Sequence, residues 1–568
     1  MESFLKRKNC DSADKELKKN KKEICPHFDN CYRKNPHHFK QYDHPHLNEF
    51  MKMGDSAIIP DGLPQPKNVY VEQLEILRQI SASSKQQTTS NKATSSGNNV
   101  PSTSSSSTSH KLSNETKPGA PNFGKGTMME KLERASPYNL FFTTIIKASE
   151  TLKQSNSITF TDLLCPSLGE LKCSLQINFM IDIDWLLKQY QARKQSLKPL
   201  TILYGDDWPD MAKFIDKFCP NVSYKLIKMK DPFGVHHSKI GIYVYDDNSI
   251  RVVVSTANLY YEDWNHYNQG LWLSPSCPRL PDSSPDTDGD SPTGFKKELL
   301  NYLKTYNEPL LKQFIEYVKR ADFGLVRVFF VYSAPGKYYP KSNGSHLHRV
   351  GNLLSNHCIL PVKTTPESEG PLSWGIIAQA SSIGSMGKSP AEWLRGSVLR
   401  ALASHAKSPM PMNSNCTLSI IYPSVDNVMT GYFGHESGGC LPYSKATNEK
   451  QRWLQKYLHQ WKAESFGRTR AMPHIKSYCR VSPCLSKLAY YLITSANLSK
   501  SAWGGPFAKD NGVYIRSYEA GVLFLPKFFD EEYFEIKNSS DRKNKSVFPF
   551  MYDLPLIPYK SDDYPWCN

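Results

Sequence analysis

The sequence predicts an α/β fold made of two similar halves, and two observations lead to this prediction. The first is a series of short apolar runs, interspersed with segments of helical spacing, that begins near Tyr138. Strands alternating with helices are typical of α/β proteins. The second is a repeat: residues 235–269 contain "HHSK" and "STANL", and residues 472–519 contain "PHIK" and "TSANL". Because each copy carries two strand-like runs, we expect the copies to be equivalent parts of two facing halves.

The composition favours a polyanionic partner. The chain has 568 residues, with 70 Lys and Arg against 54 Asp and Glu, which gives a formal charge of +16 and a pI of about 9.0. Such an excess is typical of proteins that bind nucleic acid or an anionic membrane surface. No run of 18 apolar residues predicts a transmembrane helix, and no apolar segment near the N-terminus predicts a secretory signal. The 13 Cys are scattered, as in an intracellular protein with reduced thiols and a possible metal site.

The N-terminal region combines a basic tail with a predicted zinc finger. Residues 1–23 are rich in Lys and are expected to form a disordered tail that carries a nuclear-import or nucleic-acid signal. Residues 24–46 hold two Cys and two His separated by five, six and five residues. Two thiolates and two imidazoles satisfy tetrahedral zinc, and a segment this short needs the metal in order to fold. The expected ligands are Cys25, Cys31, His38 and His44, with an accidental cluster as the alternative and His37 and His46 as competing imidazoles.

Residues 60–125 are predicted to be a low-complexity linker. Between Ser81 and His110, 17 of 30 residues are Ser or Thr, and no aromatic residue is present. Such a segment cannot bury enough apolar surface to offset the entropy lost on ordering. We therefore expect a tether with many possible phosphorylation sites between the finger and the rest of the chain.

The two halves are expected at residues 135–325 and 326–568. A strand running into an amphipathic helix is predicted from "NSITFTDLLC" and "KCSLQINFMIDIDWLLKQY", followed by buried strands in "PLTILYG", "NVSYKLIKM", "SKIGIYVY" and "IRVVVST". Helical spacing in "FKKELLNYLKTYNEPLLKQFIEYV" indicates the connection between the halves. The second round of strands is predicted in "LVRVFFVYS", "SWGIIAQAS", "CTLSIIYPS", "LAYYLITSA" and "AGVLFLP".

The pattern His-x-Lys occurs four times in the chain, but only two occurrences are followed by an apolar run that ends in Ala-Asn-Leu. Residues i and i+2 of a strand face the same side, so each His and Lys would point into one site. The Asn would follow at the end of the next strand, 21 residues after the His in the first copy and 23 in the second. The two copies supply the same three residue types: His237, Lys239, Asn258, His474, Lys476 and Asn497.

Two His, two Lys and two Asn that meet across a pseudo-twofold axis suit phosphoryl transfer. Ammonium and amide groups hold phosphate oxygens and stabilise the charge of a pentacovalent transition state. One imidazole attacks phosphorus, and the other protonates the departing oxygen. No cluster of carboxylates accompanies these residues, so we expect catalysis without a metal ion. The alternative, from the residues alone, is a pair of histidines that only stabilise two duplicated sheets.

At these residues the chain resembles the phospholipase D superfamily, and within it the tyrosyl-DNA phosphodiesterase family. The resemblance covers roughly residues 138–566 and rests on "HHSK", "STANL", "QGLWLSP", "SSIGSMG", "LPYS", "AMPHIK", "TSANLSKSAWG" and "SYEAGVLFLP". The wider superfamily carries an Asp five residues after the Lys, where this chain has Val244 and Val481, as is typical of the tyrosyl-DNA branch. The resemblance implies two phospholipase D-like α-β-α sandwich halves related by a pseudo-twofold axis.

The resemblance also implies residue roles. His237 would be the nucleophile that forms a phosphohistidine with the DNA 3′ end. His474 would protonate the tyrosine phenolate and then activate water, while Lys239, Lys476, Asn258 and Asn497 would bind the phosphoryl oxygens. Gln269 and Glu519 would fix the histidine tautomers, although which histidine each one holds stays open.

For the substrate, the resemblance places DNA phosphates at Ser381, Ser382 and Ser499, a stacked base at Phe233, and the peptide near Phe179 and Pro442. From the residues alone, the two Phe could equally be core aromatics and the Ser ordinary turn residues. The zinc segment resembles the poly(ADP-ribose)-binding zinc finger family in its spacing and in its "CYR" and "P-x-H" elements, so Tyr32 and Arg33 would contact adenine.

The sequence therefore predicts a nuclear DNA-repair phosphodiesterase that removes tyrosyl peptide, and other 3′ adducts, from DNA ends left by a trapped type IB topoisomerase. Zn²⁺ would be structural, poly(ADP-ribose) would recruit the enzyme, and we expect no membrane partner and a monomeric catalytic domain. A phospholipase or general nuclease of the same superfamily is the first alternative. A catalytically inert poly(ADP-ribose)-binding adaptor is the second, and the intact paired motifs disfavour it.

Overall fold

The computed structural model describes residues 22–25, 31, 39, 42–53, 59–60, 63, 67–90, 127–206, 209–340, 342, 344–361, 370, 373–406, 416–507, 512–536 and 547–568. The chain divides into two compact units, residues 1–117 and 118–568, and each is described by itself. Among the described residues, no helix is both long enough and apolar enough to cross a bilayer.

The N-terminal unit is a small domain with its own core. Strand β1 (Glu23–Ile24) pairs in parallel with β2 (Tyr42–Asp43), and helices α2 (Pro45–Lys52) and α3 (Lys67–Ser90) follow. The two helices contact each other and bury a set of apolar side chains: Phe39, Leu47, Phe50, Ile59, Tyr70 and Leu74.

Helix α3 corrects the prediction that a linker starts at residue 60. Tyr70 and Leu74 are buried, and Gln73 donates from Nε2 to the carbonyl of Cys31 at 2.7 Å. The first turns of α3 therefore belong to the core of the N-terminal unit. Of the Ser/Thr-rich segment, the described part ends with this helix at Ser90, and residues 91–126 lie outside the described residues.

The first half of the main unit is built on an eight-stranded sheet with the order β4-β3-β10-β9-β8-β5-β6-β7. Strands β5, β6 and β7 run parallel, whereas β3, β10, β9, β8 and β5 alternate in direction. The strands are β3 (Leu140–Thr143), β4 (Ser157–Ile158), β5 (Leu171–Ile177), β6 (Leu200–Tyr204), β7 (Val222–Leu226), β8 (Ile240–Tyr245), β9 (Ile250–Ser255) and β10 (Gly270–Leu273). The helices are α4 (Met128–Ala135), α5 (Ile183–Ala192), α6 (Pro209–Phe218) and α7 (Tyr261–Asn265).

The second half repeats this arrangement in the order β11-β20-β17-β16-β13-β14-β15, with β21 beside β17. The strands are β11 (Phe329–Ser333), β13 (Gly375–Gln379), β14 (Leu418–Ile421), β15 (Leu458–His459), β16 (Ser477–Val481), β17 (Lys487–Thr494), β20 (Glu519–Phe524) and β21 (Phe534–Glu535). The helices are α10 (His346–His357), α11 (Arg400–Leu402), α12 (Val425–Met429), α13 (Lys445–Lys450) and α14 (Lys500–Trp503).

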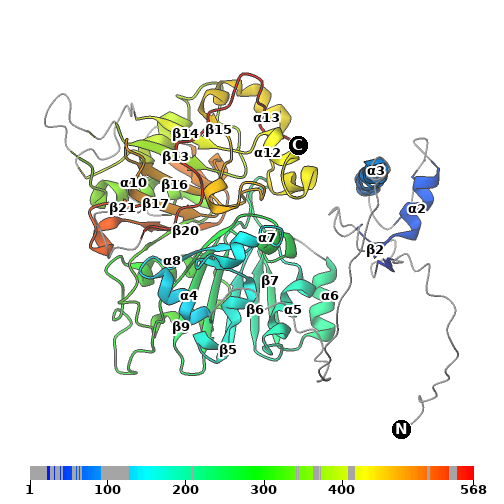
Figure 1. The fold of residues 1–568 in the computed structure, drawn as a ribbon. Helices are drawn as coiled ribbons and strands as arrows, with labels where there is room; N and C mark the ends of the chain where they lie inside the picture. The colour runs from blue at the N-terminus through cyan, green and yellow to red at the C-terminus, as the bar shows by residue number, and fades with distance from the viewer. Residues whose placement is uncertain are drawn as a thin grey trace, which may run out of the picture. The chain divides into compact units, whose positions relative to one another are not determined.

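The predicted pair of similar α/β halves is confirmed by the strand orders. The series β10-β9-β8-β5-β6-β7 and β20-β17-β16-β13-β14-β15 have the same sequence of antiparallel and parallel neighbours. Helices α8 (Phe295–Thr305) and α9 (Lys312–Lys319) lie between the two sheets in the chain. Figure 1 shows one sheet in the half coloured cyan to green and the other in the half coloured green to red.

The strands predicted from the buried apolar runs are confirmed, but the prediction is wrong near the start of the main unit. Of "NSITFTDLLC", only Ser157–Ile158 forms a strand, because the next residues turn into a 3₁₀ helix at Phe160–Leu164 that is closed by a capping box between Thr159 and Asp162. The halves share one large apolar core. At Gly270 they approach so closely that a Cβ would lie 2.4 Å from Cδ1 of Ile493, so a larger residue beside Gln269 would have to displace the ends of isoleucine side chains.

Candidate active site

Two backbone hydrogen bonds join the catalytic segments of the two halves. The N–H of His237 donates to the carbonyl of Tyr518, and the N–H of His474 donates to the carbonyl of Asn268, both at 2.9 Å. These acceptors directly precede the two side chains expected to orient the histidines. Each histidine is therefore held by the neighbouring half of the molecule, three residues before its own strand, β8 or β16, and not on the strand as predicted.

The side chain that orients His237 comes from the second half. Glu519, the first residue of β20, accepts from Nδ1 of His237 at 3.0 Å. Ser495 donates to the same carboxylate oxygen at 2.5 Å. Burial alone would raise the pKa of Glu519, but His237, Ser495 and Lys239 outweigh it and hold the pKa below its usual value. The carboxylate is therefore charged and fixes Nδ1 of His237, which leaves Nε2 of the imidazole for chemistry.

His474 is held in the corresponding way by the first half. Nδ1 of His474 lies 2.8 Å from Nε2 of Gln269 and 3.2 Å from Oδ2 of Asp263. Thr256 donates to Oε1 of Gln269 at 2.8 Å, as Ser495 does to Glu519. An Nδ1 that carries a proton donates to the Asp263 carboxylate, and one without a proton accepts from the Gln269 amide. Both protonation states of this nitrogen thus have a partner.

Asp263 is a site residue that the sequence reasoning missed. It is fully buried in α7, and the N–H of Asn258 donates to its Oδ2 at 2.5 Å. Although burial would raise the pKa of Asp263, His474, Asn258 and Lys476 lower it overall. The sequence does show a carboxylate five residues after Asn258. The second copy has Ala502 at the equivalent position, so a comparison of the two copies does not reveal Asp263 as a site residue.

The two lysines lie in the buried centre of the site. Nζ of Lys239 donates to the carbonyl of His237 at 2.7 Å, and Nζ of Lys476 donates to that of His474 at 2.5 Å. Burial lowers the pKa of Lys239 to about 7, with a further decrease from the positive charge of Lys476. Burial likewise lowers the pKa of Lys476 to about 8. Two cations held this close favour an anion between them.

The two histidines are kept neutral in the free protein. Burial and Lys239 lower the pKa of His237, while Glu519 opposes the shift. Burial and Lys476 lower the pKa of His474 to about 4. A neutral His237 has a free lone pair on Nε2 at pH 7. Even with the Asp263 carboxylate at Nδ1, His474 requires a further negative charge nearby, such as that of a bound anion, before it can carry a proton at that pH.

The asparagines close the site from the ends of β9 and β17. Oδ1 of Asn497 accepts from the backbone N–H groups of Ser381 and Ser382 at 3.1 and 3.0 Å, so its amide nitrogen is directed away from them. Asn258 is buried, and no donor among the described residues reaches its Oδ1. In addition to burial, Lys476 lowers the pKa of both Lys239 and His237, so charged groups of the two halves meet in one site.

The N-terminal unit holds a candidate zinc site. Cys25, Cys31 and His44 are buried, and their ligand atoms lie within 4.8 Å of one another, which fits a single Zn²⁺ ion. His38, the fourth expected ligand, lies outside the described residues, as do Tyr32 and Arg33. Two thiolates and an imidazole are donor types that zinc prefers.

Comparison with protein families decides the class of the main unit, since the profile of the tyrosyl-DNA phosphodiesterase family matches residues 139–560. The chain belongs to the tyrosyl-DNA phosphodiesterase family. The profile of the PBZ domain matches residues 22–47, the segment with the candidate zinc site.

Similar proteins agree with this family membership. The chain is 37% identical to tyrosyl-DNA phosphodiesterase 1 of Drosophila melanogaster over 95% of this chain and 98% of the relative. It is 30% identical to a probable tyrosyl-DNA phosphodiesterase of Caenorhabditis elegans over 76% of this chain and 89% of the relative. The crystal structure of the yeast tyrosyl-DNA phosphodiesterase shares the fold, with a TM-score of 0.57 and 22% identity over 76% of this chain and 99% of that one.

In this family member, Phe179 is the predicted substrate contact that lies beside His237 and Lys239. The Phe179 ring is 5.8 Å from the His237 ring and 5.7 Å from Nζ of Lys239. Pro442 is exposed, and its carbonyl accepts from Oγ of Ser382 at 2.6 Å. Phe233 is 76% exposed, which excludes a role as a core aromatic.

The three serines are engaged in local structure. Ser381 is buried, and both it and Ser382 support Asn497 through their backbone. Ser499 caps α14 by accepting from the N–H of Ala502 at 3.3 Å. A contact from these hydroxyls to DNA stays a prediction.

Proposed function

We propose that this protein hydrolyses the bond between a tyrosine side chain and the 3′ phosphate of DNA, including ends left by a trapped type IB topoisomerase. The observation that carries the proposal is the paired arrangement in which Glu519 holds His237 and Gln269 holds His474 across the two halves. Such an arrangement provides two differently supported imidazoles at one anion site. The family membership favours a 3′-phosphotyrosyl substrate for them.

In the first step, Nε2 of His237 attacks phosphorus and the bond to the tyrosine oxygen breaks. The proton on Nε2 of His474 goes to the departing phenolate, so tyrosyl peptide leaves and DNA remains bound to His237 as a phosphohistidine. The positive charge that develops on the His237 ring lies beside the Glu519 carboxylate. This contact favours the nucleophilic role for His237.

In the second step, neutral His474 takes a proton from water, and the oxygen of that water attacks the phosphohistidine. The bond between phosphorus and His237 breaks, which yields a DNA 3′ phosphate and the free imidazole. His474 regains its proton in this step and is ready for another cycle. Throughout the cycle Nδ1 of His474 keeps its proton and donates it to Asp263, so the proton that moves in each step is the one on Nε2.

The lysines and asparagines supply the charge stabilisation that a metal provides in many phosphodiesterases. Ammonium groups of Lys239 and Lys476 and the amides of Asn258 and Asn497 would bind the non-bridging oxygens, where negative charge grows in the transition state. The two carboxylates of the site are already paired with the histidines. We infer that catalysis requires no metal ion, and that zinc bound by Cys25, Cys31 and the two predicted His ligands stabilises the N-terminal unit only.

The PBZ match supports poly(ADP-ribose) as the ligand of the N-terminal unit, with Tyr32 and Arg33 as the predicted contacts. A polymer that marks damaged DNA would bring the enzyme to its substrate in the nucleus, and the basic N-terminal tail agrees with nuclear import. The range of other 3′ adducts accepted by the site is a further question for the same assay.

The test is a gel assay with a 5′-labelled, 3′-phosphotyrosyl oligonucleotide, in the presence and absence of EDTA. Conversion to the 3′-phosphate oligonucleotide under both conditions is the expected result. Hydrolysis of phosphatidylcholine without cleavage of the oligonucleotide would instead identify a phospholipase. Binding of poly(ADP-ribose) with no cleavage by the full chain would identify an adaptor.

A further inference from the structure

A small surface sheet beside the active site presents rings and cations on one face. It has the order β12-β19-β18, formed by Gly336–Tyr338, Val513–Ile515 and Gly505–Pro506. Lys337 and Gly505 both lie opposite Tyr514 in this sheet. Because side chains two residues apart share a face, five residues project from the same side. We call this surface the aromatic–cation face: Lys337, Tyr339, Phe507, Tyr514 and Arg516.

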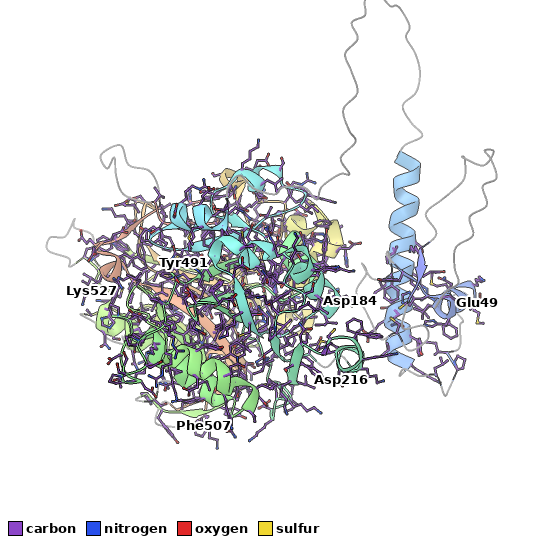
Figure 2. The ribbon with its side chains drawn as sticks, turned by 90° about the horizontal axis from the view of Figure 1, so that it is seen from below. Glu49, Asp184, Asp216, Tyr491, Phe507 and Lys527 are labelled. Atoms are coloured by element: carbon purple, nitrogen blue, oxygen red, sulfur yellow. The ribbon has the colours of Figure 1, made fainter. Side chains whose placement is uncertain are left out.

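This face points to solvent because the opposite face is packed on the protein. Val513 and Ile515 are buried, whereas Tyr339 is 46% exposed and Phe507 is 38% exposed. Exposed aromatic side chains that gather in one patch are typical of interaction sites. Figure 2 shows Phe507 at the outer edge of the main unit.

Cationic side chains lie close to the aromatic rings of the aromatic–cation face. Nζ of Lys337 is 5.0 Å from the centre of the Phe507 ring, and the Tyr339 ring is 6.0 Å from Phe507. The guanidinium of Arg516 is 5.3 Å from the centre of the Tyr514 ring. An aromatic surface interleaved with cations is the composition that single-stranded nucleic acid prefers, since bases stack on the rings and phosphates pair with the cations.

The face is continuous with the entrance of the active site. Nε of Arg516 is 3.2 Å from Oδ2 of Asp231, and this carboxylate is the acidic group that faces the arginine. A Cβ on Gly234 would lie 2.4 Å from the carbonyl oxygen of Arg516, so the two segments are in contact. Phe233, between Asp231 and Gly234, is 76% exposed and precedes the proposed nucleophile His237 by four residues.

We propose that the aromatic–cation face binds the DNA strand upstream of the reacting 3′ end, in single-stranded form. The inference rests on the proposed function and names the substrate more closely: a 3′-blocked end with a single-stranded segment long enough to reach this sheet. Strand β19 and its flanks extend about 14 Å from Arg516 to the residue opposite Tyr339, at about 3.4 Å per residue. That length matches roughly four stacked nucleotides.

The experiment compares two lengths of the same substrate. Phe507→Ala with Tyr339→Ala is tested in the full chain on a 3′-phosphotyrosyl dinucleotide and on a single strand of about fifteen nucleotides, within the range that nucleic-acid-binding folds cover. Phe218→Ala is the matched control, because Phe218 is 60% exposed and has Nζ of Lys217 at 5.0 Å from its ring. Asp216, on the same helix as Phe218, lies well apart from Phe507 in Figure 2.

The double variant is expected to raise KM about tenfold or more for the long strand, as loss of a stacked base does, and to leave kcat and the dinucleotide unchanged. Lys337→Gln should reduce the salt dependence of KM for the long strand only. Equal losses on both lengths, or no loss on either, would overturn the inference. A loss that follows the length of the tyrosyl peptide would show that the face binds peptide. An intact enzyme that cleaves neither substrate would refute the proposed function itself.

Discussion

Replacement of Glu519 by Gln isolates the electrostatic support of the proposed nucleophile. The amide has the same shape as the carboxylate and can still accept from Nδ1 of His237, while Ser495 keeps its contact with the side chain. What changes is the charge beside the ring that becomes positive when phosphorus is attacked. We therefore expect a slower first step with little effect on folding or on substrate binding.

The size of the effect follows from the geometry. Nδ1 and Oε2 are 3.0 Å apart, and the charge centre of the ring lies further from the carboxylate. At about 4 Å and an effective dielectric of about 20, two unit charges interact by about 4 kcal/mol. The amide dipole replaces part of this, so a loss of about 3 kcal/mol remains, which corresponds to about 10²-fold in rate.

The assay is a single-turnover measurement with a labelled 3′-phosphotyrosyl oligonucleotide, in which formation and decay of the protein–DNA adduct are followed separately. Asp263→Asn is the matched control, because it removes the carboxylate beside His474 instead. It should slow decay of the adduct more than its formation. The reasoning is refuted if Glu519→Gln changes adduct formation by less than threefold, or if it slows only the decay.

Three further predictions concern the same machinery. His237→Ala should form no adduct, whereas His474→Asn should form one slowly and retain it, since general acid–base help is worth about 10²–10⁴-fold; denaturing electrophoresis distinguishes them, and the reverse pattern would exchange the roles. The cationic forms of Lys239 and Lys476 exist below their pKa values of about 7 and about 8, so kcat/KM should fall as pH rises through this range, and a flat profile to pH 10 would contradict the assignment. Chelation should unfold the N-terminal unit, seen by circular dichroism of residues 1–117, and spare hydrolysis by the full chain; loss of turnover restored by Mg²⁺ would reveal a catalytic metal.

The repeated fold was predictable because its signals are local. Apolar runs such as "SKIGIYVY" and "LAYYLITSA" form β8 and β17, and the two His-x-Lys pairs directly precede the equivalent strands β8 and β16. Periodicity and spacing are contained within tens of residues, so a single sequence suffices. The same holds for the finger, where Cys25, Cys31 and His44 come together as their spacing suggested.

The pairing of the orienting side chains was not predictable because packing between the halves decides it. Glu519 is 282 residues from His237, and Gln269 is 205 residues from His474. Because the two copies are similar, the sequence is equally compatible with each histidine being oriented by a residue of its own half or by a residue of the other half. The structure selects the crossed pairing because the backbone of each histidine bonds to the segment just before the other half's orienting residue.

Helix α3 shows a second reason why part of the structure was not predicted from the sequence. The spacing of Tyr70, Leu74 and Leu77 is helical, but the Ser/Thr-rich residues that follow Ser81 dominated the composition of the window. Burial of Tyr70 and Leu74 offsets the entropy lost on forming the helix only if they have an apolar surface to pack against. Phe39 and Leu47 provide it, and they come from parts of the chain that precede α3, so the sequence of α3 alone does not reveal the contact.

The crossed hydrogen bonds have a consequence for the history and engineering of the chain. A half expressed alone would keep its imidazole and lysine, but it would lose the side chain that sets the histidine tautomer and both backbone hydrogen bonds that join the halves. The smallest active unit therefore contains both halves, whether or not a peptide connects them. The fragments 118–325 and 326–568, produced separately, should each be catalytically inactive, and turnover should return when they are mixed. An ancestor with one copy would have worked only as a self-associating pair.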